Sequence, residues 1–367
     1  MKEIYLDNSA STQIDNNVLE YMFQIAKDCY ANPSSVHKLG QKSRRIMDES
    51  RETIAMFLKI KSRELIFTSS GSEANNLALR GIMKSPKYKG NHIISTKIEH
   101  SSVLKTLEDL EKEGVEVTLL DVDKYGNINL EDLTKAIKPS TRLISIIHAN
   151  NEIGTIQDIK SIGEICKAKN IVFHVDAVQS FGKILFYPEE YNINLMSIAA
   201  HKLYGPKGIG ALYISSGTKL EKIITGGYQE RNRRAGTENI PAIAGFAKAT
   251  ELAYSIIHAE SQREKELRDY METLILEQIP SVTINGNLNN KTLQQVEDIV
   301  SNIIGVDENR GDSISVVGMP FDTLANEDDN LAVKDDINKV INSGTFFAIR
   351  IPVTTGTINN QGVIVKL

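Results

Sequence analysis

Short β-prone runs alternate with helical stretches from residue 64 to residue 215, and this alternation restricts the possible folds more than any other feature. The runs are Glu64–Thr68, His92–Ser95, Glu116–Asp121, Arg142–Ile147, Ile171–Val175, Ile193–Ala200 and Ile209–Ile214. Alternating strands and helices form right-handed βαβ units and a mostly parallel sheet covered on both faces. Ligands bind such sheets beyond the carboxyl ends of the strands, so chemically active residues should directly follow strands.

Apolar residues at helical spacing predict further helices on both sides of this block, at Asp15–Tyr30, Gly40–Leu58 and Ile240–Glu277. The composition of 41% hydrophobic and 24% charged residues in 367 is that of a globular chain of about two domains. A net charge of -5 without a basic stripe argues against a nucleic-acid partner. No apolar run approaches the roughly 18 residues of a membrane span.

Cys29 and Cys166 are the only cysteines, too few for a disulfide framework or a metal-ligand cluster. No metal site is therefore expected. Acidic residues stand near the N-terminus where a signal peptide would be apolar. These features together predict a cytoplasmic protein.

Lys202 follows His201 and precedes a turn built from Gly205, Pro206 and Gly208. Apolar segments on both sides read as buried strands, so the lysine ammonium should be hard to solvate. Desolvation lowers the pKa of a lysine and leaves a neutral amine that can attack a carbonyl. The alternative is a surface lysine in a polar turn.

Thr68–Leu77 follows the first strand of the block and opens a helix. Small residues let the backbone approach an anion, and free N–H groups of a first helical turn can hold a phosphate. The alternative is an ordinary capping box from Ser70 to Glu73. His100 also lies between a strand and a helix, where it can stack on a flat ring or simply satisfy the helix terminus.

Asp176 ends the strand Ile171–Val175. A carboxylate at the tip of a buried strand needs a positive or hydrogen-bonding partner. A protonated pyridine nitrogen is such a partner, and the bond would contribute about 1.5–3 kcal/mol. The alternative is an aspartate that caps the next helix. Gln179 is expected one helical turn further, on the same side as Asp176.

A phosphate-binding helix start, a ring-stacking histidine, an acid for a ring nitrogen and a strand-tip lysine are the parts of a pyridoxal 5'-phosphate site. In this arrangement residues 5 to about 290 closely resemble the cysteine desulfurases, class V members of the pyridoxal-phosphate transferase fold type I. The motifs that carry the resemblance are Tyr5–Thr12, Asn32–Ser35, Phe67–Leu77, His148–Gly154, His174–Ser180, His201–Gly208 and Arg234–Thr237.

The resemblance implies a role for each matching residue. Lys202 would bind the cofactor's aldehyde covalently, and His100 would stack on the ring and shuttle protons. Asp176 would hold the pyridine nitrogen. Asn151 and Gln179 would serve the side of the ring hydroxyl. The phosphate would be bound by Gly71, Ser72 and His201 from the same chain and by Thr237 from the second subunit of a homodimer.

Ala199 is a departure from the family inside this site, because the family usually has a serine there that donates to the phosphate. A second departure lies after residue 290, where the family's mobile loop with its nucleophilic cysteine and its carboxylate-binding arginine are absent. Arg310 and Arg350 match no family context. The fold class implied is α/β, with a mostly parallel seven-stranded sheet and an atypical, incomplete C-terminal small domain.

The predicted domains are residues 1–290, which bind the cofactor, and residues 291–367. Within the second, Val296–Thr323 resembles a segment of the flagellar M-ring protein family, with an Arg-Gly-Asp turn and a Met-Pro-Phe ending. The remaining residues after Ala325 resemble no family.

The function implied by the main resemblance is conversion of L-cysteine, or a related amino acid, to alanine. The sulfur would pass through an enzyme persulfide to acceptor or scaffold proteins for iron–sulfur cluster or thiolated cofactor synthesis. The absent cysteine loop predicts that this activity is impaired. Two alternatives need no cysteine nucleophile: a pyridoxal-phosphate lyase or aminotransferase, and a non-catalytic fusion remnant.

Overall fold

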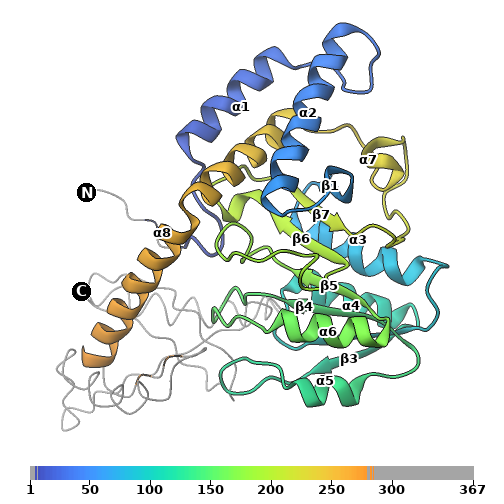
Figure 1. Ribbon diagram of the computed structural model, residues 1–367, viewed down its shortest axis with the longest axis vertical. Helices are drawn as coiled ribbons and strands as arrows, with labels where there is room; N and C mark the ends of the chain where they lie inside the picture. Colours follow the sequence, from blue (N-terminus) through green and yellow to red (C-terminus); the bar gives the residue numbers. More distant parts are fainter. Residues whose placement is uncertain (1–4, 6, 279–281, 283, 285–367) are drawn as a thin grey trace, which may run out of the picture. The chain divides into compact units, whose positions relative to one another are not determined.

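The computed structural model describes residues 5, 7–278, 282 and 284 (Figure 1). The chain divides into two compact units. Residues 8–151 and 155–262 form the unit that contains the whole sheet and every predicted site residue. The predicted segment at 291–367, including the M-ring-like piece, lies outside the described residues.

A seven-stranded sheet runs through the larger unit in the order β1-β7-β6-β5-β4-β2-β3. Its strands are β1 (Leu65–Thr68), β2 (His92–Thr96), β3 (Glu116–Leu120), β4 (Thr141–Ile147), β5 (Val172–Asp176), β6 (Leu195–Ala199) and β7 (Gly210–Ile214). The pairs from β6 through β5, β4 and β2 to β3 are parallel, whereas β7 is antiparallel to both of its neighbours. The predicted fold class, a mostly parallel α/β sheet, is confirmed.

The helices of the described residues are α1 (Asn16–Asp28), α2 (Lys38–Phe57), α3 (Gly71–Lys84), α4 (Ser101–Lys112), α5 (Leu130–Ala136), α6 (Ile159–Lys169), α7 (Gln229–Asn232) and α8 (Ile240–Gln278). The three helices whose bounds were predicted, α1, α2 and α8, lie within two residues of those bounds, because apolar spacing sets which turns can be buried. Asn170 ends α6 in a left-handed conformation that asparagine tolerates.

Successive residues of the strands enter two different hydrophobic clusters on opposite faces of the sheet. Ile66, Ile93 and Leu143 pack in the cluster that contains α3 and α4, at Leu77, Ala78, Val103 and Leu107. Their neighbours Phe67, Ile94 and Ile144 pack in the cluster that contains α2, α6 and the start of α8. This period of two follows from the pleat of a strand.

Asp176 alternates with Val175 and therefore faces the same side as Val172, which belongs to the α3 and α4 cluster. The N-termini of α3 and α4 begin just beyond the carboxyl ends of β1 and β2. The fold thus delivers two helix starts to the side of the sheet on which the Asp176 carboxylate lies.

Candidate active site

Asp176 is the one acid among the predicted site residues, and its carboxyl group is buried, with 3% of the residue exposed. One oxygen accepts a hydrogen bond from the Val178 backbone N–H at 3.0 Å, and the other accepts from Asn75 Nδ2 at 2.7 Å. Burial raises the pKa of Asp176, while these two bonds and the nearby His100 and Lys202 oppose the rise. A cationic hydrogen-bond donor brought to this carboxylate would relieve its desolvation.

Asp176 does not cap a helix, because residues 178–183 form turns. The prediction that Gln179 lies one helical turn further is therefore wrong in its local structure. Gln179 Nε2 instead donates to the Ser9 carbonyl at 2.9 Å. This contact ties the turn after β5 to the segment before α1.

The start of α3 is a capped helix, as the alternative for this motif predicts, and anion binding there stays a prediction. Ser70 is the N-cap and accepts from the Glu73 backbone N–H at 3.1 Å. A Cβ atom at Gly71 would lie 2.6 Å from Val178 Cγ2, so only glycine lets the helix start come this close to the end of β5. Ala199 Cβ lies 3.6 Å from the same position, which puts the predicted departure from the family beside the helix start.

Lys202 lies at the end of a short 3₁₀ turn, Ala200–Lys202, which directly follows β6. Its ammonium is half-buried and donates to the carbonyls of Ser9 and Ala10. Backbone carbonyls therefore satisfy part of this ammonium, and whether its pKa is lowered stays a prediction. The Thr12 backbone N–H and hydroxyl both donate to the His201 carbonyl, at 3.0 and 2.9 Å, which fastens this N-terminal segment over the turn.

His201 accepts or donates a weak hydrogen bond with the Ser11 hydroxyl, 3.3 Å from Nδ1. Burial lowers the pKa of His201 to about 4, with Lys202, Lys207 and His100 adding like-charge repulsion. The imidazole is therefore neutral at physiological pH. A neutral ring can donate a hydrogen bond to an anion without the cost of burying a charge.

His100 is the N-cap of α4, so the structural alternative for this residue is correct. Its Nδ1 lies 3.1 Å from the Ser102 backbone nitrogen and 2.8 Å from the Ser102 hydroxyl. The ring remains exposed while its Nδ1 edge is occupied. A capping histidine of this kind keeps its faces available for stacking.

Of the remaining predicted residues, two lie in loops and one lies in a helix. Asn151 is in the turn that follows β4, and Ser72 is in the first turn of α3. Thr237 lies exposed in the loop between α7 and α8. His100 and Lys202 are both close enough to lower the pKa of Asp176 and that of His201, so the structure brings these four together.

Three residues of this region were not identified from the sequence as site residues: Asn75, Ser102 and Glu99. Asn75 is 1% exposed, and its Nδ2 donates both to Asp176 and, at 2.8 Å, to the Ser102 hydroxyl. All three lie inside motifs already singled out, Thr68–Leu77 and the residues around His100. The sequence feature that could have identified them is a polar residue on the side of a helix start that is expected to be buried.

Glu99 is a buried acid, 5% exposed, directly before His100. Its Oε1 accepts from the Thr96 hydroxyl at 2.7 Å and from the Ile147 backbone N–H at 3.0 Å. Oε2 is buried and has no hydrogen-bond partner among the described residues. Burial, with repulsion from Asp176, raises the pKa of Glu99 to about 8, so the carboxyl group is neutral at pH 7.

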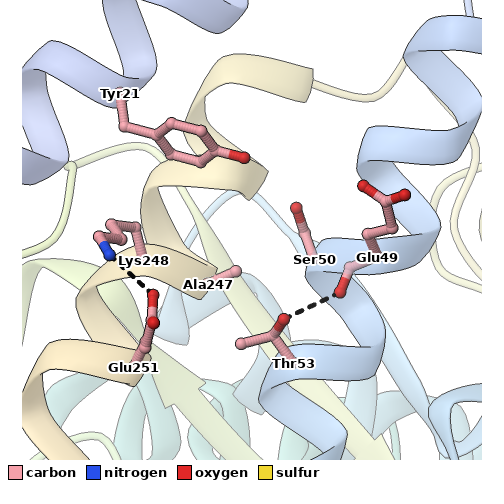
Figure 2. A pocket seen from close by; sticks show the side chains of 7 residues that line it. All are labelled: Tyr21, Glu49, Ser50, Thr53, Ala247, Lys248 and Glu251. Atoms are coloured by element: carbon pink, nitrogen blue, oxygen red, sulfur yellow. Dashed lines mark hydrogen bonds and ion pairs between the residues drawn. The ribbon is translucent and has the colours of Figure 1, made fainter. Parts of the chain in front are cut away.

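A separate pocket of about 350 Å³ lies between α1, α2 and α8 (Figure 2). Its lining is largely polar and includes Tyr21, Glu49, Thr53 and the ion pair of Lys248 with Glu251 at 2.9 Å. None of the predicted site residues lines it. The pocket is therefore not the predicted cofactor site.

The residues at the carboxyl ends of the strands fit pyridoxal phosphate. Asp176 is a buried carboxylate with one bond to each oxygen, and Gly71 brings no side chain of its own to the first backbone N–H groups of α3. Lys202 supplies an amine and His100 an exposed flat ring. These are the groups that recognise a ring nitrogen, a phosphate, an aldehyde and an aromatic face.

Residues 4–308 match the model of the aminotransferase class-V family. The chain belongs to this family. A cysteine desulfurase IscS of Dictyoglomus turgidum is 47% identical over 290 residues, which are 79% of this chain and 74% of that protein. The chain is therefore a cysteine desulfurase-like enzyme of the pyridoxal-phosphate-dependent kind.

Solved structures of the same family have the same fold. A NifS-like protein superposes with a TM-score of 0.72 at 39% identity and covers 74% of each chain. SspA in complex with cysteine superposes with a TM-score of 0.66 at 41% identity, covering 68% of this chain and 72% of the other. The resemblance of residues 296–323 to the flagellar M-ring family finds no support in these comparisons, and the class-V match itself extends to residue 308.

Among the described residues, no helix combines the length and the apolar character that crossing a membrane requires.

Proposed function

We propose that this chain binds pyridoxal phosphate through Lys202 and accepts L-cysteine or a related amino acid, but does not complete desulfuration. Bound pyridoxal phosphate supplies an electron sink that weakens the bonds of an attached amino acid. The cofactor half of the site is supported by the buried Asp176 carboxylate and the glycine cradle at the α3 start. The cysteine substrate is supported by the cysteine bound in the SspA structure.

Each site residue has a task that its surroundings suit. Asp176 would hold a proton on the ring nitrogen, because a carboxylate with only two bonds can accept a third. The backbone N–H groups of Gly71 and Ser72, with neutral His201, would bind the phosphate, and Thr237 would reach it from a second subunit. His100 would lie on the ring, and Asn151 with Gln179 would face its hydroxyl side.

The lack of a reactive thiol carries the proposal that sulfur transfer fails. A thiolate must attack the substrate sulfur, and the chain has only Cys29 and Cys166. Cys29 is 4% exposed and Cys166 1% exposed, and burial raises the pKa of both, that of Cys166 to about 12. Cys166 lies inside α6, and Cys29 is the residue that ends α1, so neither is on a long mobile loop.

Sulfide release from L-cysteine, with a reductant present, tests this proposal. We expect no release above that of a Lys202→Ala protein. Lysine-dependent sulfide with equal alanine, at roughly 1 per second or faster, would overturn it, and Cys29→Ser and Cys166→Ser variants would then identify the thiol. Because sulfur is not released to a thiol, we expect no delivery to acceptor or scaffold proteins by this chain alone.

The same assay separates the two alternatives. A lyase would yield sulfide together with pyruvate and ammonia, and no alanine. A non-catalytic remnant would leave the absorbance of the bound cofactor unchanged when L-cysteine is added. We expect the absorbance to change, since the amine of the substrate can replace the Lys202 amine on the cofactor.

A homodimer and a cytoplasmic location are parts of the same proposal. Large apolar side chains are exposed on α1 and in the loop that joins it to α2, including Phe23, Tyr30 and Val36, the last 89% exposed. Such side chains are enriched where subunits meet. Both cysteines are free and buried, which suits a reducing compartment. A sedimentation measurement that found a cofactor-bound monomer would contradict the dimer.

A further inference from the structure

A chain of hydrogen bonds connects the Asp176 carboxylate to the ring of His100. Asn75 Nδ2 donates one proton to Asp176 Oδ2 at 2.7 Å and the other to Ser102 Oγ at 2.8 Å. Ser102 Oγ lies 2.8 Å from His100 Nδ1. Asn75 and Asp176 are buried, Ser102 is half-buried and His100 is exposed, so this series of hydrogen bonds runs from the interior to the surface.

The direction of each bond follows from what its partners can donate. An ionised carboxylate only accepts, so the asparagine must turn its amide nitrogen toward Asp176. The Ser102 oxygen accepts from the same nitrogen, which leaves the single hydroxyl proton for His100 Nδ1. The Ser102 backbone N–H donates to Nδ1 as well, at 3.1 Å. Two donors therefore face one imidazole nitrogen.

This orientation of the Asn75 amide leaves its oxygen without a hydrogen bond. Asn75 Oδ1 is buried and has no hydrogen-bond partner among the described residues. An unsatisfied buried acceptor is destabilising, and a flipped amide would place this oxygen against the Asp176 carboxylate instead. The orphaned oxygen is thus the consequence of directing both amide protons toward Asp176 and Ser102.

We propose that Asn75 and Ser102 are positioning residues that hold His100 in the tautomer with its proton on Nε2. His100 Nε2 has no hydrogen-bond partner within the described part of the chain, so it is the nitrogen left for a bound molecule. Resting on the proposed function, this makes neutral His100 a hydrogen-bond donor toward the substrate or cofactor. It does not present a lone pair there and cannot act as a base through Nε2.

Nitrogen chemical shifts of ¹⁵N-labelled histidine, measured by NMR, report the tautomer directly. The chain has seven histidines, and a His100→Gln protein identifies the His100 signals by their loss. In the unmodified protein we expect the tautomer with a bare Nδ1 and a protonated Nε2 to outnumber the other tautomer by roughly ten to one or more. This ratio corresponds to one hydrogen bond, which the other tautomer would lose. A predominantly protonated Nδ1 would overturn the proposal.

Variants at position 102 separate positioning from a merely structural role. Ser102→Thr keeps the hydroxyl and should keep the shifts. Ser102→Asp replaces a donor by a charged acceptor, whose stronger bond should draw a proton onto Nδ1 in most molecules. Ser101→Asp adds the same charge in the same helical turn and should leave the tautomer unchanged. Asn75→Ala releases the Ser102 hydroxyl and should give a mixture.

Unchanged His100 shifts in Ser102→Asp would refute the role of Ser102, and unchanged shifts in Asn75→Ala would refute that of Asn75. The shifts are measured with and without pyridoxal phosphate, and L-cysteine is titrated against cofactor absorbance in the same proteins. Failure to bind the cofactor would overturn the proposed function while the tautomer stayed measurable. With cofactor bound, we expect Ser102→Thr to retain L-cysteine affinity and Ser102→Asp to lose about tenfold, one hydrogen bond's worth. Equal affinities would refute the donor role of Nε2.

Discussion

Replacing Glu99 with glutamine should change how the stability of the protein depends on pH. Glutamine resembles the neutral carboxyl group but cannot ionise. The pKa of Glu99 is raised from an ordinary 4.5 to about 8 by burial and by Asp176. The folded state therefore holds a proton that the unfolded state releases, and folding stability falls as pH rises from the unfolded pKa to the folded pKa.

The magnitude follows from this one proton. Between the two pKa values the loss is about 1.4 kcal/mol per pH unit, or roughly 3 kcal/mol from about pH 5 to about pH 7. The Glu99→Gln protein should lack this slope. The glutamine amide would occupy the place of Oε2, which has no partner among the described residues, and could cost about 1–3 kcal/mol. That penalty does not depend on pH, so the slope is the decisive quantity.

Urea unfolding of the cofactor-free proteins at several pH values between about 5 and 8 measures the slope. Buried histidines also titrate, but they are present in both proteins and cancel in the difference. Asp176 repels an ionised Glu99, so that repulsion is part of the measured effect. Glu64→Gln is the matched control, since Glu64 is equally buried at 3% exposure. Burial favours its neutral form, but hydrogen bonds from Ser216 and Lys61 outweigh burial and lower the pKa of Glu64.

The pKa of Glu64 is shifted in the opposite direction from that of Glu99, so its contribution to stability changes in a different pH range. Stability from a lowered pKa is complete above the unfolded value and is lost as pH falls through the folded value. Glu64→Gln should therefore shift the stability curve by a constant amount between about pH 5 and about pH 8, without a change in slope. If Glu99→Gln and unmodified protein had the same slope in this window, Glu99 would be ionised when folded, and the argument from its burial would be wrong.

Three further outcomes are expected. Borohydride reduction should fix the cofactor to the peptide containing Lys202, and mass spectrometry should find no such adduct in Lys202→Ala protein. Arg51 forms a buried ion pair with Glu230, so Arg51→Ala should lower the free energy of unfolding by about 3–5 kcal/mol by leaving the Glu230 carboxylate buried without its cation; a change below about 1 kcal/mol, as at an exposed pair, would contradict this. Gly71→Ala should weaken cofactor affinity roughly tenfold or more in an absorbance titration, since its Cβ would overlap Val178; unchanged affinity would show that the α3 start does not bind the phosphate.

The strands and helices could be predicted because burial imposes a simple period on each. The apolar run at Arg142–Ile147 became β4, within one residue of its bounds, and the helical spacing at Asp15–Tyr30 became α1, within two. The rule that ligands bind beyond the carboxyl ends of strands also led to Asp176 and His100. Both positions follow from chain direction and strand length alone.

The contacts that complete the site could not be predicted, because they depend on which strands become neighbours. Glu99 follows β2, and it accepts from the Ile147 N–H at the end of β4 because β2 and β4 are neighbours. Ile147 in turn pairs with Asp176 of β5. Asn75 and Asp176 are 101 positions apart, and nothing local in either motif indicates their bond. The alternatives considered for Ser70 and His100 were not exclusive, since a helix cap and a ligand-binding helix start use the same geometry.

The ion pair of Arg51 with Glu230 has a similar long-range origin and compensates local strain. Glu230, Arg231 and Asn232 all have left-handed backbone angles, with φ of 44°, 58° and 62°. Each such residue costs about 1 kcal/mol or more. The Glu230 carboxylate accepts two hydrogen bonds from Arg51, at 2.8 and 2.7 Å, and one from the Phe67 backbone N–H at 2.8 Å.

Arg234 fastens the other end of the same segment by pairing with Glu73 at 2.8 Å. Glu73 also accepts from the Ser69 backbone N–H at 2.7 Å, at the start of α3. The loop that carries Thr237 and the helix start that carries Gly71 therefore share one carboxylate. Because the strained backbone is held at both ends by half-buried or buried charges, displacing either the loop or the helix start must break an ion pair that supports the other.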